Sequence, residues 1–123
     1  MKIYLSLAKH DDNYACGLVL DNDYHYSEFS FPFGEATYDN SRYRSLKIAL
    51  TSIKPKFKND KVILYVDNED FFDSIRGNET LKSKFMYYED MTIKLDKYSS
   101  NMLNAQQIAQ SSAKNQEPHN YAR

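Results

Sequence analysis

The chain has 123 residues, of which 16 are basic and 17 acidic, so its formal net charge is -1. This length is typical of one domain with a single core, and the balanced charge excludes a polycation that binds nucleic acid through bulk charge. An aromatic content of 15% argues against long disorder, and no apolar run approaches the roughly 20 residues of a membrane-spanning helix. Cys16 is the single cysteine, which excludes an internal disulfide and a cysteine-built zinc site. Because the N-terminus does not resemble a signal peptide, we expect a cytoplasmic protein.

The first third of the chain predicts a meander of three strands. Residues 2–7 are rich in strand-forming side chains and are followed by a polar turn. Residues 15–20 form the return strand. The aromatic-rich stretch 24–32 is the third strand, and Pro32 and Gly34 end the sheet pattern.

A helix and a buried strand come next. Asp39 or Asn40 can cap a helix whose apolar residues recur every three or four positions as far as Ile53, and Pro55 ends it. The continuous apolar run 62–66 has the length and composition of a central strand that is buried on both faces. These two elements predict the middle of a mixed sheet.

The next segment predicts a short helix and a half-exposed strand. Asp67 and Asn68 offer a helix cap, and Gly77 follows as a helix end. Residues 78–91 are ambiguous and favour only a helical turn. In residues 91–95 apolar and polar side chains alternate, which is typical of a strand with one buried face.

A final helix completes the predicted domain. Ser99 or Ser100 caps it, and its apolar side runs from Leu103 to Ala109. From about Ser111 the chain is too polar to bury. We therefore expect one domain over residues 1–114 and a mobile polar tail over residues 115–123.

Three segments carry a family resemblance. They are the start of the first helix with its Ala49-Leu50 end, the buried strand ending in Asp67 with the short helix behind it, and Ala105 to Ala109 of the final helix. In this order and spacing they resemble the ribonuclease H family. The resemblance implies an α/β fold with a mixed five-stranded sheet: three antiparallel strands, then helix, strand, helix, strand, helix.

The resemblance also implies where catalytic carboxylates should lie. The family's two-metal chemistry needs a cluster of carboxylates, because divalent magnesium takes oxygen ligands. Of four such positions Asp67 keeps its carboxylate, whereas the others fall on Ser6, Arg42 and Gln106. This remnant of a metal site predicts no metal, no cofactor and no catalytic residue. We expect an ion pair between Asp67 and Arg42, or Arg44 if the register slips by two residues; the simpler interpretation of Asp67 is a helix cap.

Charged and aromatic residues suggest two candidate binding surfaces. A basic group on the first helix and its exit is a candidate for phosphate binding, although an ordinary solvated face explains it as well. An acidic group with two tyrosines is a candidate for protein binding. The basic residues are Arg44, Lys47, Lys54 and Lys58, and the second group comprises Asp67, Glu69, Asp70, Asp73, Tyr87 and Tyr88.

Three functional hypotheses follow. The favoured one is a non-catalytic protein-interaction module, such as an inhibitor or adaptor of a host factor. The richness of the chain in Lys, Asn, Asp, Tyr and Ile is typical of an AT-rich genome, such as that of a phage or mobile element. The alternative is a nucleic-acid-binding protein that uses the basic first helix. The third is a weak metal-dependent nuclease.

Overall fold

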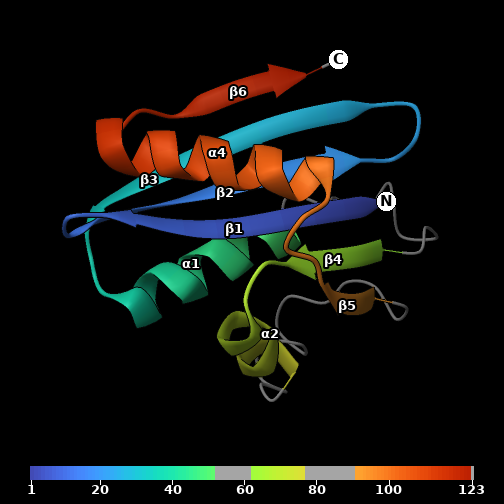
Figure 1. Ribbon diagram of the computed structural model, residues 1–123, viewed down its shortest axis with the longest axis horizontal. Helices are drawn as coiled ribbons and strands as arrows, with labels where there is room; N and C mark the ends of the chain where they lie inside the picture. Colours follow the sequence, from blue (N-terminus) through green and yellow to red (C-terminus); the bar gives the residue numbers. More distant parts are fainter. Residues whose placement is uncertain (52–61, 77–90, 123) are drawn as a thin grey trace.

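The computed structural model describes residues 1–51, 62–76 and 91–122, and in this part of the chain it contains the predicted succession of elements (Figure 1). The N-terminal half holds Lys2–His10 (β1), Asn13–Asp21 (β2), Tyr26–Glu35 (β3) and Tyr38–Thr51 (α1). The remainder holds Val62–Val66 (β4), Glu69–Arg76 (α2), Met91–Leu95 (β5), Ser100–Asn115 (α4) and His119–Ala122 (β6). The helical turn predicted within residues 78–91 falls largely outside the described residues.

The strands form one mixed sheet in the order β5-β4-β1-β2-β3-β6. Strand β1 pairs antiparallel with β2 and parallel with β4, and β4 pairs parallel with β5. This arrangement is a mixed α/β fold. Residues 62–66 form β4, which lies next to the edge strand β5 and not at the middle of the sheet. Val62, Leu64 and Val66 are fully buried, whereas Ile63 and Tyr65 are half-buried.

The sheet has six strands, and the prediction of five was wrong. The additional strand β6 lies in the segment predicted as a mobile tail and pairs antiparallel with Ser27 to Ser30 of β3. All four β6 residues are exposed, so burial of apolar side chains does not hold this strand in place. Backbone pairing does, together with a hydrogen bond from the His119 amide to Ser30 Oγ at 2.9 Å.

Helices cover both faces of the sheet and form two cores. On one face α1 packs against β1 and β2, over a core that includes Ile3, Leu18 and Leu64. On the other face α4 crosses β1, β2 and β3, and its Met102 joins a smaller core (Figure 1). No described helix is long and apolar enough to cross a membrane.

The helix starts differ partly from those predicted. For α1, Thr37 is the cap, because its Oγ1 accepts a hydrogen bond from the Asn40 amide at 3.2 Å; the prediction of Asp39 or Asn40 was wrong. For α4, the predicted cap Ser99 is confirmed, since its side chain accepts from the Met102 amide. A side-chain acceptor one turn earlier satisfies the free amides of each first turn.

Cys16 lies fully buried in β2, on the α1 side of the sheet. Burial disfavours the charged thiolate and raises the pKa of the Cys16 thiol to about 12. Its role is that of a small apolar core residue.

Gly17 sets the distance between α4 and the sheet. A Cβ atom at this position would overlap the carbonyl oxygen of Ala105 and press on Ile108 and the Ala109 amide. The helix presents a small buried face to β2 here, with Ala105 and Ala109 fully buried. The missing side chain of Gly17 and the small methyl groups of α4 let the two backbones touch.

We predict that Gly17→Ala destabilises the fold by about 3 kcal/mol, because the added methyl group forces α4 off the sheet. Gly34→Ala is the matched control: Gly34 has φ 69, and an added Cβ would meet Gln116 Oε1 at the ordinary contact distance of 3.9 Å, so the expected cost is the backbone strain of about 1 kcal/mol. Urea unfolding of both variants measures the difference. Equal stability of the Gly17→Ala variant and the unmodified protein would contradict this account.

Candidate functional site

Three of the four positions predicted as a metal-site remnant meet at the centre of the sheet. Leu5 of β1 pairs with Val66 of β4, so the residues that follow them, Ser6 and Asp67, lie side by side. Ser6 Oγ donates a hydrogen bond to Asp67 Oδ2 at 2.6 Å. Gln106 of α4 donates from Nε2 to the same oxygen at 3.2 Å. We call these three residues the Asp67 cluster.

Two neutral donors, the Ser6 hydroxyl and the Gln106 amide, contact one carboxylate oxygen of Asp67. Ser6 is buried, with 3% of its surface exposed, while Asp67 and Gln106 are half-buried. A carboxylate that accepts charge-assisted hydrogen bonds is held in one orientation. Among residues 1–51, 62–76 and 91–122, no group of three or more His, Cys, Asp or Glu side chains is arranged to hold a metal ion. The contacts seen in the Asp67 cluster are hydrogen bonds.

The structure contradicts the predicted ion pair between Asp67 and Arg42. Arg42 instead contacts Asp39 Oδ1 at 3.3 Å and Asp70 Oδ2 at 3.9 Å, and it donates to Ser74 Oγ at 2.9 Å. Asp39 is one helical turn before Arg42 and Asp70 lies in the facing helix α2. These carboxylates are more accessible to a long side chain on the surface of α1 than the enclosed Asp67.

The helix cap of α2 is Asn68 and not Asp67. Asn68 Oδ1 accepts a hydrogen bond from the Phe71 amide at 2.6 Å, and the Asn68 carbonyl oxygen accepts from the Phe72 amide. The Asp67 side chain does not cap α2 and instead lies at the centre of the sheet, where it accepts hydrogen bonds from Ser6 and Gln106. The simpler interpretation of Asp67 as a cap was therefore wrong.

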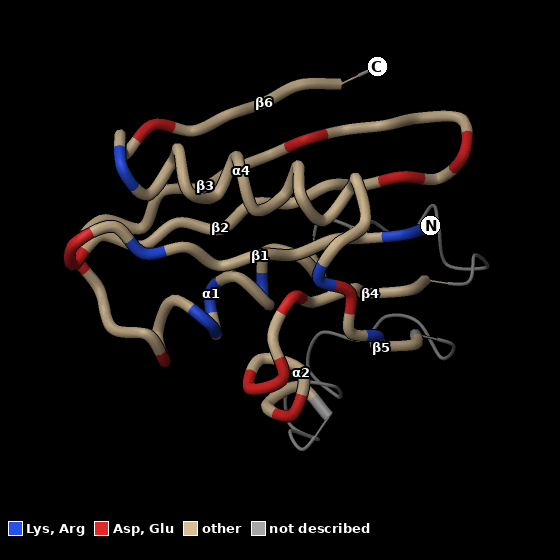
Figure 2. The backbone as a smooth tube through the Cα atoms, in the orientation of Figure 1, with Lys and Arg blue, Asp and Glu red and all other residues tan. Residues whose placement is uncertain are grey.

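The predicted acidic group divides into two parts. Asp67 belongs to the cluster at the sheet, whereas Glu69, Asp70 and Asp73 are exposed on α2, where Figure 2 shows acidic segments on successive turns. We call these three residues the acidic α2 patch. Tyr38 Oη donates to Asp70 Oδ2 at 2.7 Å. Burial, and then the Asp70 carboxylate, raise the pKa of Tyr38 to about 12, so this donor stays protonated at neutral pH.

The predicted basic group is only partly described. The guanidinium of Arg44 lies over the ring of Phe33, 4.3 Å from its centroid, and Lys47 is exposed one turn later. Figure 2 shows these basic segments on α1, separate from the acidic turns of α2. Four other predicted residues lie outside the described part of the chain: Lys54, Lys58, Tyr87 and Tyr88.

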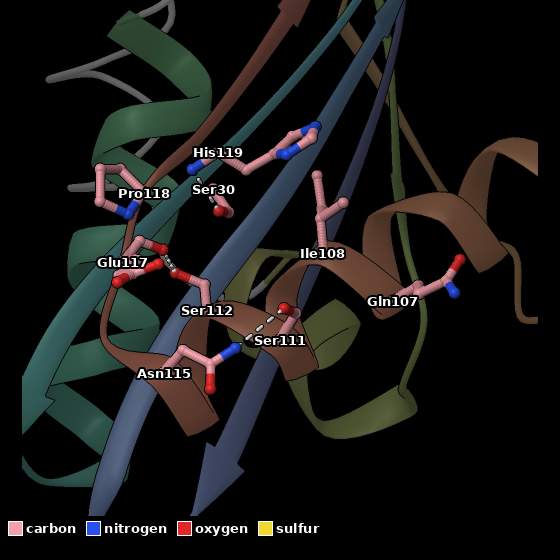
Figure 3. A pocket seen from close by; sticks show the side chains of 9 residues that line it. All are labelled: Ser30, Gln107, Ile108, Ser111, Ser112, Asn115, Glu117, Pro118 and His119. Atoms are coloured by element: carbon pink, nitrogen blue, oxygen red, sulfur yellow. Dashed lines mark hydrogen bonds between the residues drawn. The ribbon is translucent and has the colours of Figure 1, made fainter.

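A small polar pocket lies between α4 and β6 (Figure 3). Its volume is about 350 Å³. The interior hydroxyls already have partners, since Ser112 Oγ donates to the Glu117 carbonyl and Ser30 Oγ accepts from the His119 amide. Sequence reasoning missed this pocket because one wall belongs to the segment predicted as a tail. Its lining residues are Ser30, Gln107, Ile108, Ser111, Ser112, Asn115, Glu117, Pro118 and His119.

Comparisons with known proteins find matches among solved structures. No protein-family model and no curated protein matches the chain. Among solved structures, the chain is similar to a foamy viral protease-reverse transcriptase in complex with double-stranded DNA. The TM-score is 0.47 at 14% sequence identity, and the match covers 92% of this chain and 90% of that chain. Similarity at this level does not establish a shared function.

We predict that Ser6→Ala lowers the free energy of unfolding by about 2 kcal/mol, because it removes the short hydrogen bond to a half-buried carboxylate. Ser111→Ala, at an exposed position of α4, should change it by no more than about 0.5 kcal/mol. Urea denaturation at neutral pH gives both values. If the two variants are equally stable, the hydrogen bond from Ser6 to Asp67 contributes nothing to the fold.

Proposed function

We propose that this chain is a non-catalytic ribonuclease H-like protein that works by binding another protein. The proposal combines the family resemblance of its segments with the state of the one carboxylate at the centre of the sheet. The order of elements, three antiparallel strands followed by helix, strand, helix, strand and helix, supports the ribonuclease H-like part. The chemistry of the Asp67 cluster supports the absence of catalysis.

The observation that carries the proposal is the identity of the partners of Asp67. Two divalent cations about 4 Å apart require several carboxylates to offset their mutual repulsion. Asp67 Oδ2 instead accepts hydrogen bonds from the Ser6 hydroxyl and the Gln106 amide. A hydroxyl and an amide nitrogen add no negative charge. The cluster therefore favours a fixed hydrogen-bond network over a pair of metal ions.

The acidic α2 patch is the surface that we assign to the partner. Glu69, Asp70 and Asp73 are exposed on a helix of eight residues, and Arg42 is shared between Asp39 and Asp70 on the flank. A negative surface repels a phosphate backbone and attracts a protein with basic residues, increasing the association rate and selecting the partner. An inhibitor or adaptor that acts on a basic host protein would use such a surface.

For the non-catalytic part, we predict that the unmodified protein neither cleaves RNA:DNA hybrid with Mg²⁺ or Mn²⁺ nor gains thermal stability from millimolar Mn²⁺. The double variant Ser6→Asp with Gln106→Asp brings two more carboxylates to Asp67, so it should be less stable without metal and be stabilised by Mn²⁺. Thermal unfolding with and without the ion measures this. Metal-dependent cleavage by the unmodified protein that Asp67→Asn abolishes would overturn the proposal.

For the binding part, we predict that reversing charge on the acidic α2 patch removes a specific partner. Glu69→Lys with Asp73→Lys should lose a basic protein that the unmodified chain captures from its source cell, and the capture should weaken with salt. The control is Asp12→Lys with Glu117→Lys, which makes the same charge change at exposed positions elsewhere. Equal capture by both double variants would exclude the patch as the contact surface.

A further inference from the structure

One face of β3 carries three phenylalanines. The register pairs Phe29 with Leu18 and Phe31 with Cys16. Leu18 and Cys16 belong to the core on the α1 side of the sheet, and side chains of paired residues lie on the same face. Phe33 also packs against this core. The three rings therefore follow one another along the α1 side of β3.

Helix α1 does not cover this row of rings completely. It packs against β1 and β2, and Figure 1 shows it lying toward β1 and β4, away from the edge formed by β3 and β6. Phe29 and Phe33 are half-buried, and Phe31 keeps 37% of its surface exposed. A large aromatic side chain is thus accessible at the middle of the row.

Arg44 of α1 borders the rings, and a second cation follows it on the helix. Arg44 places its guanidinium over the Phe33 ring at 4.3 Å, and Lys47 lies one turn further along, exposed. Stacking uses the flat face of the guanidinium and leaves its N–H edge available to bind an oxyanion in bidentate fashion. Within the described residues Arg44 has no carboxylate partner, whereas Arg42 has two.

We propose that these five residues, the β3 stripe, bind single-stranded nucleic acid. Phe31 offers its ring to an unpaired base, while Arg44 and Lys47 contact the phosphates beside it. The stripe comprises Phe29, Phe31, Phe33, Arg44 and Lys47. This inference goes beyond the proposed protein contact and uses a different part of the molecule, since the acidic α2 patch contains no residue of the stripe.

The chemistry of the stripe selects this ligand. Aromatic rings beside cations match the alternation of flat bases and phosphates in a single strand. A duplex keeps its bases stacked on one another, so it can use the cations but not the rings. The nearest acidic side chain within β3, Glu28, contacts His119 on the opposite face. Glu35 is exposed at the end of β3. Its negative charge would repel a phosphate, so the proposed binding surface ends there.

The chain contains no tryptophan, which allows a direct test. The Phe31→Trp variant carries a single indole at the proposed stacking position. We expect thymidine and adenosine oligonucleotides to quench its fluorescence in a saturable manner, and a duplex of the same length to quench it far less. Because single strands release counterions, the logarithm of affinity should fall with the logarithm of salt concentration by about 0.7 per phosphate contact.

Matched variants separate the phosphate contacts of Arg44 and Lys47 from the stacking of a base on Phe31. Arg44→Glu with Lys47→Glu should weaken binding of a labelled oligonucleotide about tenfold or more and reduce the salt slope. Lys97→Glu with Lys114→Glu makes the same charge change at exposed positions away from the stripe and should have little effect. Phe31→Leu keeps apolar bulk but removes the ring, so affinity should fall while the salt slope stays.

Several results would overturn the inference. They are the absence of quenching at any salt concentration, equal binding of duplex and single strand, and equal loss of affinity in the two double charge variants. A change in indole emission with protein concentration alone would mean that a second copy of the chain covers the stripe. Charge reversal at Glu69 and Asp73 should leave oligonucleotide binding intact, so failure of the proposed protein contact is distinguishable from failure here. Circular dichroism confirms that each variant is folded.

Discussion

The close approach of α4 to the sheet at Gly17 is the constraint on which the rest of the structure depends. Backbone meets backbone there because Gly17 has no side chain and α4 presents Ala105 and Ala109. At this distance Met102 reaches the small core beside Tyr4, and Gln106 reaches Asp67, the residue that follows β4. A helix standing further off would fill the space with larger side chains and would leave the carboxylate without its second donor.

The charge distribution follows from how the acidic side chains are satisfied. Asp67 Oδ2 accepts hydrogen bonds from Ser6 and Gln106, while Arg42 contacts Asp39 and Asp70. Three exposed carboxylates lie on α2, while Arg44 and Lys47 are exposed on α1 (Figure 2). A nearly neutral chain therefore presents two surfaces of opposite sign to its surroundings.

Much of this arrangement could be predicted from the sequence, because it rests on periodicity and order along the chain. The apolar run 62–66 and the cap Ser99 are of this kind, whereas the grouping of Ser6, Asp67 and Gln106 was implied by the family resemblance. The pairing of Arg42 could not be predicted, since a long side chain chooses among several carboxylates whose distances depend on the fold. Strand β6 was missed because it is held by backbone hydrogen bonds, which leave no pattern of apolar side chains.

The pairing of β6 with β3 also protects the edge of the sheet against aggregation with other copies of the chain. An open strand edge invites another chain to add a strand, which leads to aggregation. Beyond the four residues paired with β6, the β3 edge continues through Pro32, which has no N–H, and Gly34, whose N–H is bound by the Gln116 side chain at 2.7 Å. The side-chain oxygen of Gln116 thereby accepts the hydrogen bond that the backbone of an added strand would otherwise accept. These contacts occupy the β3 edge where another chain would otherwise pair.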